Sequence, residues 1–190
     1  RACHGGGDYT RRWASRRHHR VDDVIVIPTL PASKPLFRYF ILDVDDVAGN
    51  DESNQKRWQV ADFDLLVGGA RVTGATYKSW NGSMTGNTTS NTEYGNTGET
   101  SANAGDGSTA TKCLDTRNTT GGLVGLWVDT TTPKAVSGYR WYTANDFTNR
   151  DMTAWKLYGS VDNTNWTLLS TVTSFSPTTT RLALAGTWAL

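Results

Sequence analysis

The chain has 190 residues, the length of one domain or of one domain plus an arm, and enough to bury a core without disulfide staples. Its 19 lysines and arginines nearly balance its 18 acids, so the net charge of +1 does not favour nucleic acid, and no apolar run approaches the ~20 residues of a membrane span. The 29 threonines, 19 glycines and eight tryptophans favour short strands and turns over helices.

The N-terminal segment is strongly basic. Residues 1–20 hold six arginines, all three histidines and one acid, Asp8, whereas residues 22–64 hold nine acids against four basic residues. This asymmetry predicts that an N-terminal arm, residues 1–33, docks on an acidic surface of its own subunit or of a neighbouring copy; the alternative is a solvated tail. The residues expected to mediate assembly are Arg11, Arg12, Trp13, Arg16, Arg17, Val24 and Val26.

Strand patterns follow one another along the rest of the chain. A β-branched run at 24–27 is stopped by Pro28 and Pro31, so the arm is predicted to hold one short strand. In the run 58–67, the apolar side chains alternate with Asp62 and Asp64, which lie on the opposite face. The remaining strands are predicted at 37–45, 123–130, 135–143, 154–160, 165–173 and 180–188.

The segment between these strands, residues 68–121, is rich in Gly, Asn, Thr and Ser. Its aromatic residues, Tyr77, Trp80 and Tyr94, favour long ordered loops with short strands over a disordered linker. No pattern supports a helix longer than two turns. The sequence therefore predicts an all-β domain over residues 34–190, a β-sandwich or jelly roll.

The C-terminal half carries a recognisable motif. Tyr139–Asp146, Arg150-Asp151, Trp155–Ser160 and Asn165–Leu169 together resemble the discoidin family, also called coagulation-factor type C or galactose-binding-like domains. In this chain, Met152 replaces a usual proline and the 162–165 turn replaces a usual Asp-Gly turn. The resemblance implies a jelly roll with a hairpin. Its inner face is predicted to carry Trp155, Leu157 and Gly159 from one strand and Trp166 and Leu168 from the next.

A second match implies a metal. Residues 103–115 resemble a family loop that often wraps calcium with a carboxylate, a threonine hydroxyl and backbone carbonyls, the oxygen ligands a hard cation needs. Cys113 stands where the family has tryptophan. Cys3 and Cys113 are either two unrelated thiols or a disulfide, which implies an oxidising setting. The candidate calcium ligands are Asp106, Thr111, Asp62, Asn103 and Ser108.

A third match is out of order. Phe37–Val44 and Val60–Leu65 resemble the family's closing strands, which in most members come last and here come first. Either the domain is circularly permuted and residues 36–67 close their own sheet, or these strands complete a neighbouring subunit. Permuted versions resemble modules of phage tail and fibre proteins. The family uses an acid of this run for calcium; here it is Asp62, which is shorter than the usual glutamate.

Catalysis has little support in the sequence. All three histidines lie in the arm, so no Ser–His–Asp or Cys–His set can form in the domain, and there is no phosphate loop or metal-hydrolase spacing. We expect a protein that is not an enzyme. Glycan contact is the alternative chemistry, although Trp80 fits a core plug as well as a sugar platform. The candidate glycan-binding residues are Trp80, Tyr94, Asn91 and Arg150.

These observations favour a structural and adhesive role. We expect a self-assembling subunit of a virion (tail, fibre or decoration) or of an extracellular filament, which binds other copies of itself through the arm and contacts glycans. The alternative is a calcium-dependent carbohydrate-binding module without an assembly role. Nucleic acid is disfavoured because the domain does not continue the basic surface of the arm. The first residues lack a secretory signal and residue 1 is not methionine, so we expect a processed form or a fragment.

Overall fold

The fold was analysed in a computed structural model, which describes residues 34–50, 55–80, 82–84, 98–116 and 125–190. The chain divides into two units, residues 1–32 and 33–190, and the account below concerns the second. The predicted strand 24–27 and the seven assembly residues lie outside the described residues. The strands before the long central loops are β1 (Phe37–Val47), β2 (Trp58–Val60), β3 (Asp62–Val67), β4 (Ala70–Arg71) and β5 (Thr76–Ser79). The later elements are η1 (Ser101–Gly105), β6 (Cys113–Asp115), β7 (Leu126–Lys134), β8 (Gly138–Tyr142), η2 (Thr148–Arg150), β9 (Met152–Ser160), β10 (Trp166–Val172) and β11 (Leu184–Ala189).

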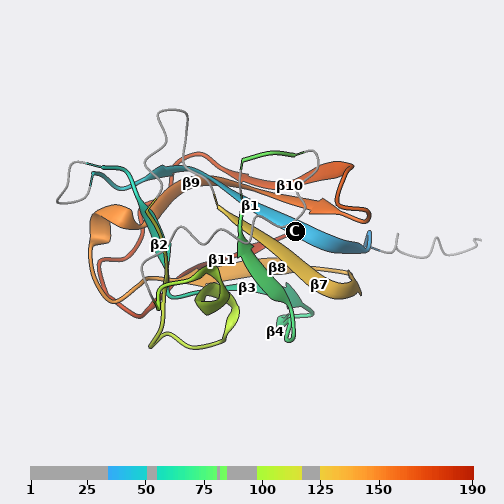
Figure 1. The fold of residues 1–190 in the computed structure, drawn as a ribbon, viewed down its shortest axis with the longest axis horizontal. Coiled ribbons are helices and arrows are strands. Elements are labelled where there is room, and N and C mark those ends of the chain that lie inside the picture. The colour runs from blue at the N-terminus through green and yellow to red at the C-terminus, as the bar shows by residue number, and fades with distance from the viewer. Residues whose placement is uncertain (1–33, 51–54, 81, 85–97, 117–124) are drawn as a thin grey trace, which may run out of the picture. The chain divides into compact units, whose positions relative to one another are not determined.

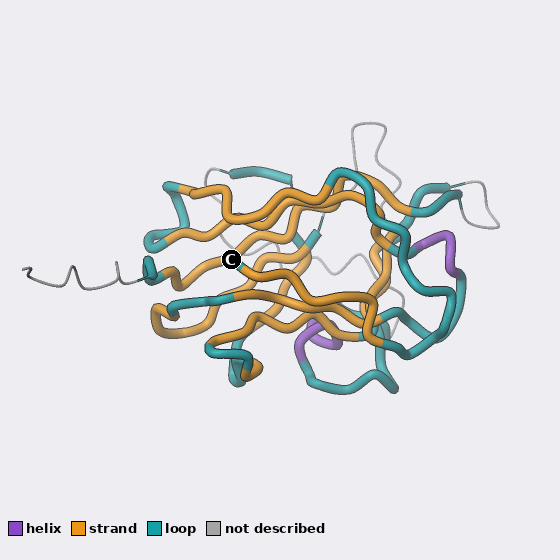
Figure 2. The backbone as a smooth tube through the Cα atoms, turned by 180° about the vertical axis from the view of Figure 1, so that it is seen from behind, coloured by secondary structure: helices purple, strands orange, loops and turns teal. Residues whose placement is uncertain are grey.

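The strands form two main antiparallel sheets that lie in two layers (Figure 1). One sheet has the order β10-β9-β1-β7-β5, the other has the order β11-β8-β3-β4, and β2 pairs with β6 in a separate ladder. In the described part of the chain, the helical elements are two short 3₁₀ turns, seen at the edges of the layers in Figure 2. The all-β prediction is confirmed. None of the described helices is long and apolar enough to cross a membrane.

An aromatic cluster fills the space between the two layers. The ring centroid of Trp155 lies 4.9 Å from that of Trp188 and 6.0 Å from that of Trp141. Two polar groups of the cluster are paired, because Trp155 Nε1 donates to the Tyr139 hydroxyl at 3.0 Å, which in turn lies 2.9 Å from Ser170 Oγ. Trp141 Nε1 is buried without a hydrogen-bond partner among the described residues. Buried aromatic rings contribute strongly to a core through the large area that they remove from water.

The strands formed by residues 37–47 and 62–67 pair within the sheets of their own chain. β1 lies in the middle of the five-stranded sheet, between β9 and β7, and β3 pairs with β8 in the other sheet. Of the two predicted pairings, the structure therefore has the one in which these strands close sheets of their own chain, and the circular permutation stays a prediction. The predicted strand 58–67 breaks at Ala61, whose N–H donates to the Tyr142 carbonyl at 2.9 Å. At that point the chain leaves the β2–β6 ladder and enters the four-stranded sheet.

The predicted β9–β10 hairpin is confirmed, but the prediction that Trp166 and Leu168 face the interior is wrong. Leu168 lies opposite Tyr158 and is 52 % exposed, and Trp166 packs in a second cluster on the outer face. The turn sets this register: the Asp162 carboxylate accepts the N–H groups of residues 164 and 165 at 2.9 and 2.8 Å. Alternation in the sequence does not reveal a shift of one residue in the turn before a strand. Such a shift exchanges the inward-facing and outward-facing side chains of that strand.

The second cluster lies on the outer face of the five-stranded sheet. Its buried members are Ile41, Trp80 and Trp127. The short described segment 82–84 lies over this face, because Trp166 Nε1 donates to the Met84 carbonyl at 2.9 Å. Apolar side chains thus cover both faces of β1, which explains why its sequence is almost continuously apolar from Phe37 to Val44.

Candidate binding site

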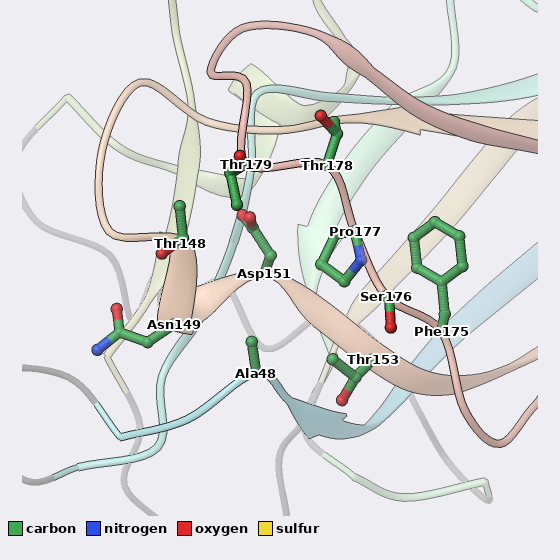
Figure 3. A pocket seen from close by; sticks show the side chains of 10 residues that line it. All are labelled: Ala48, Thr148, Asn149, Asp151, Thr153, Phe175, Ser176, Pro177, Thr178 and Thr179. Atoms are coloured by element: carbon green, nitrogen blue, oxygen red, sulfur yellow. The ribbon is translucent and has the colours of Figure 1, made fainter.

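A cleft of about 400 Å³ opens at the end of the sheets where β1 ends and β9 begins. Its two walls face each other in Figure 3: η2 and the start of β9 form one, and the connection between β10 and β11 forms the other. The lining residues are Ala48, Thr148, Asn149, Asp151, Thr153, Phe175, Ser176, Pro177, Thr178 and Thr179.

Backbone hydrogen bonds hold the walls in place. The Ala48 N–H donates to the Asp151 carbonyl and the Gly49 N–H donates to the Asn149 carbonyl, both at 2.9 Å. The Phe175 N–H donates to the Thr153 carbonyl, also at 2.9 Å. Three separate stretches of chain are therefore tied together before any side chain is considered, which makes the cleft a largely preformed site.

A buried ion pair joins the two walls of the cleft. Arg181 Nη1 and Nη2 donate to the two oxygens of the buried Asp151 carboxylate at 3.0 and 2.5 Å. The same guanidinium also donates to the carbonyls of Asp146 and Thr178, at 3.0 and 3.1 Å. Burial raises the pKa of Asp151 above its ordinary value, and the Arg181 contacts oppose that shift. Because both carboxylate oxygens are engaged, Asp151 positions the walls.

The exposed chemistry of the cleft is rich in hydroxyl groups. Four threonines, one serine and one asparagine line it, together with the apolar Ala48, Phe175 and Pro177. The Phe175 ring is fixed edge-on against Trp155, Trp188 and Trp141, with centroids 5.7, 5.3 and 6.1 Å away. Among the lining residues described, Asp151 is the one carboxylate, whereas glycoside hydrolysis uses two. The arrangement suits hydrogen bonding to a polyhydroxyl ligand.

The two described residues that were predicted for glycan contact, Trp80 and Arg150, do not line the cleft. Trp80 is 4 % exposed in the second cluster, and its Nε1 donates to the Ser83 carbonyl at 2.9 Å. Arg150 is 4 % exposed at the end of η2, with its guanidinium 4.1 Å from the centroid of the Phe147 ring. Asn91 and Tyr94 lie outside the described residues. Sequence reasoning missed the cleft, although the run of Ser, Pro and Thr after Phe175 was a usable signal for it.

Four of the five predicted calcium ligands share one loop. Asp106 Oδ1 accepts the Ser108 N–H and Asp106 Oδ2 accepts the Thr111 hydroxyl, both at 2.7 Å. Asn103 Nδ2 donates to the carbonyls of Gly98 and Lys112 at 2.6 and 2.9 Å. These polar side chains thus form hydrogen bonds with groups of the loop and of the residues next to it.

The fifth ligand, Asp62, comes from β3 and is buried beside this loop. Burial together with the neighbouring Asp64 raises the pKa of Asp62 to about 7, and Arg71 and the backbone of Gly107 oppose that shift. Arg71 Nη2 lies 3.6 Å from Asp62 Oδ1, and the same guanidinium donates to the Asp64 carboxylate and the Gly105 carbonyl.

This arrangement does not fit a calcium ion. Calcium requires about six to eight oxygen ligands, whereas the oxygens gathered here face a guanidinium or accept hydrogen bonds from the loop itself. No group of three or more His, Cys, Asp and Glu side chains placed to hold a metal occurs in the described part of the chain. The thermal melting in EDTA and in calcium chloride that is described below tests the calcium prediction.

The predicted disulfide concerns the same region. Cys113 is buried in β6 opposite Val60, and Cys3 lies outside the described residues, so their pairing stays a prediction. Comparison with known proteins adds no family: the chain matches no protein-family model, no curated protein and no solved structure.

Proposed function

We propose that this chain is a non-catalytic carbohydrate-binding module with a circularly permuted, discoidin-like jelly roll, and that the glycan binds in the cleft beside η2. The observation that carries the proposal is the cleft itself, where hydroxyl-rich walls are held by a buried Arg181–Asp151 pair around an immobilised Phe175. The volume of about 400 Å³ is in the usual range for small-molecule sites.

The position of the motif residues supports the proposed family. The aromatic residues Tyr139, Trp141 and Trp155 of the discoidin-like motif are fully buried between the sheets. The displaced strands β1 and β3 pair with β9 and β8, the strands that carry the rest of the motif. A permuted chain with its closing strands at the N-terminal end would have this pairing.

The chemistry of the cleft supports a sugar over other small ligands. Hydroxyl and amide groups can both donate to and accept from sugar hydroxyls, and an apolar patch accommodates the C–H face of a sugar ring. Asp151 is already neutralised by Arg181, so the cleft carries no unpaired carboxylate that would favour a cation.

A self-assembling role at the surface of a virion or an extracellular filament remains the second candidate. The charge of the arm favours it. However, two described acids of the acidic segment already pair with lysines of the domain: Asp45 lies 2.6 Å from Lys156 and Asp46 lies 2.5 Å from Lys56. Size-exclusion chromatography of the full chain and of residues 34–190 tests this role, which predicts a larger assembly for the full chain alone.

Glycan-array screening followed by calorimetry of the best hit tests the carbohydrate proposal. The double variant Ser176→Ala and Thr179→Val should weaken binding at least tenfold, because it removes two hydroxyls from one wall of the cleft. Thr173→Val is the matched control, since Thr173 is exposed on the same connection and does not line the cleft. Equal binding by both variants, or an array without hits, would overturn the proposal.

A further inference from the structure

We infer that Arg71 is a built-in cation that organises the loop 101–111, and that the domain folds around this loop without a bound metal ion. The guanidinium lies between two buried acids of β3 and the backbone of the loop. It donates to the Asp64 carboxylate and to the Gly105 carbonyl, and it lies 3.6 Å from Asp62 Oδ1.

The first step of the argument is charge balance. Asp62 and Asp64 are both buried, and two buried carboxylates require compensation because desolvation makes an unpaired charge costly. Arg71 faces both of them, and Arg140 Nε donates to Asp64 Oδ2 at 2.8 Å. Both guanidinium groups therefore donate to Asp64, and Arg71 is also the cation beside Asp62. A divalent cation added beside Asp62 would be repelled by Arg71.

The second step is the close approach of the loop. Gly107 has a φ of 81°, and a side chain at this position would overlap Nη1 of Arg71. A side chain at Gly105 would overlap the ring of Tyr77, whose hydroxyl donates to the Phe63 carbonyl at 2.9 Å. The two glycines thus allow the loop to press against β3 through Arg71 and Tyr77.

The third step is the chemistry of arginine. A guanidinium remains charged at all relevant pH values and offers five donors in a planar fork, so one side chain can bind a carboxylate and a carbonyl in different directions. Arg71 reaches these partners from β4, which pairs with β3 at Leu66. A backbone carbonyl and a carboxylate are the groups that a calcium ion would hold together, and here one arginine joins them.

Thermal melting of the full chain, in EDTA and in excess calcium chloride, tests the inference together with the variants Arg71→Gln and Arg71→Lys. The wild-type protein should show the same Tm in both buffers. Arg71→Gln should lower the Tm by roughly 10 °C, because it leaves the buried Asp62 without its neighbouring cation and Asp64 with Arg140 alone, and Arg71→Lys should fall in between. Arg38→Gln is the control, since Arg38 also pairs with a carboxylate, that of Asp129, but at a more exposed position and away from the loop.

Hydrogen exchange provides a local readout. Arg71→Gln should increase amide exchange in peptides that cover residues 101–111, and Arg38→Gln should leave them unchanged. If Arg71→Gln does not fold, Arg71→Lys takes its place in this comparison. A wild-type Tm that rises in calcium would overturn the inference, as would unchanged exchange of the loop in the Arg71 variants.

Discussion

The cleft and the loop 101–111 are built by the same device and have opposite outcomes. In each region, the guanidinium of an arginine donates to a buried carboxylate and also to backbone carbonyls of a neighbouring segment. Arg181 ties the walls of the cleft together from behind and leaves their hydroxyls open to a ligand. Arg71 lies between the loop and β3, where Gly107 lets the backbone of the loop approach the guanidinium closely. The two regions therefore differ in what their arginine holds: the walls of a cleft in one case, and a loop against a strand in the other.

Removal of the arginine behind the cleft should have the largest effect. Arg181→Gln leaves the buried Asp151 carboxylate without its partner and should lower the free energy of unfolding by about 3 kcal/mol. Denaturation in urea measures this loss. The double variant Arg181→Gln with Asp151→Asn should recover part of it, because the buried charge is also removed. If the losses of the two single variants simply add, the pair does not act as a unit.

Closure of the loop region can be tested at its glycines. Gly107→Ala should cost about 2–3 kcal/mol, because it combines the strain of a positive φ with overlap on Arg71. Gly98→Ala is a matched control: its φ is 86°, but nothing lies within 4 Å of the added carbon. It should cost only about 1 kcal/mol. If urea denaturation gives equal losses in the free energy of unfolding for both variants, the close approach of Arg71 to Gly107 does not contribute to stability.

The sequence was informative about strands and much less so about these two regions. The pattern of alternation predicted the longer strands, because each of them repeats apolar residues locally, and the family resemblance implied the β9–β10 hairpin. It could not predict Arg71, whose partner Gly105 lies 34 residues away along the chain. It also missed the cleft, whose walls come from stretches as far apart as Ala48 and Phe175. Local patterns specify elements, whereas these sites depend on which segments the topology brings together.

The pH dependence of stability should separate the buried pair from an exposed one. The pKa of Asp151 is raised on folding, so its contribution is fully present below the unfolded pKa of about 3.9 and is lost as the pH rises through the folded pKa. The pKa of Asp129 is lowered by Arg38, so its contribution is present above about 3.9 and is lost as the pH falls. Urea denaturation between pH 3 and 6 gives the free energy of unfolding as a function of pH. Relative to the wild type, Asp151→Asn should make the slope of this dependence more positive, and Asp129→Asn should make it less positive. Changes of the same sign in the two variants would contradict the assignment.

The smallest expected loss of stability is that of Arg38→Gln, and it tests whether burial of the carboxylate explains the larger losses. Arg38 forks onto Asp129 with Nε–Oδ1 and Nη2–Oδ2 distances of 2.8 and 2.9 Å, a geometry comparable to that of Arg181 on Asp151. The side chains of the Arg38 pair are 38 % and 17 % exposed, against 20 % and 1 % for the Arg181 pair. Arg38→Gln should therefore cost only about 0.2–1 kcal/mol, and less in high salt, because water solvates the charges left behind. A loss as large as that of Arg181→Gln would show that the two-point geometry, rather than burial of the carboxylate, determines how much these arginines contribute to the free energy of unfolding.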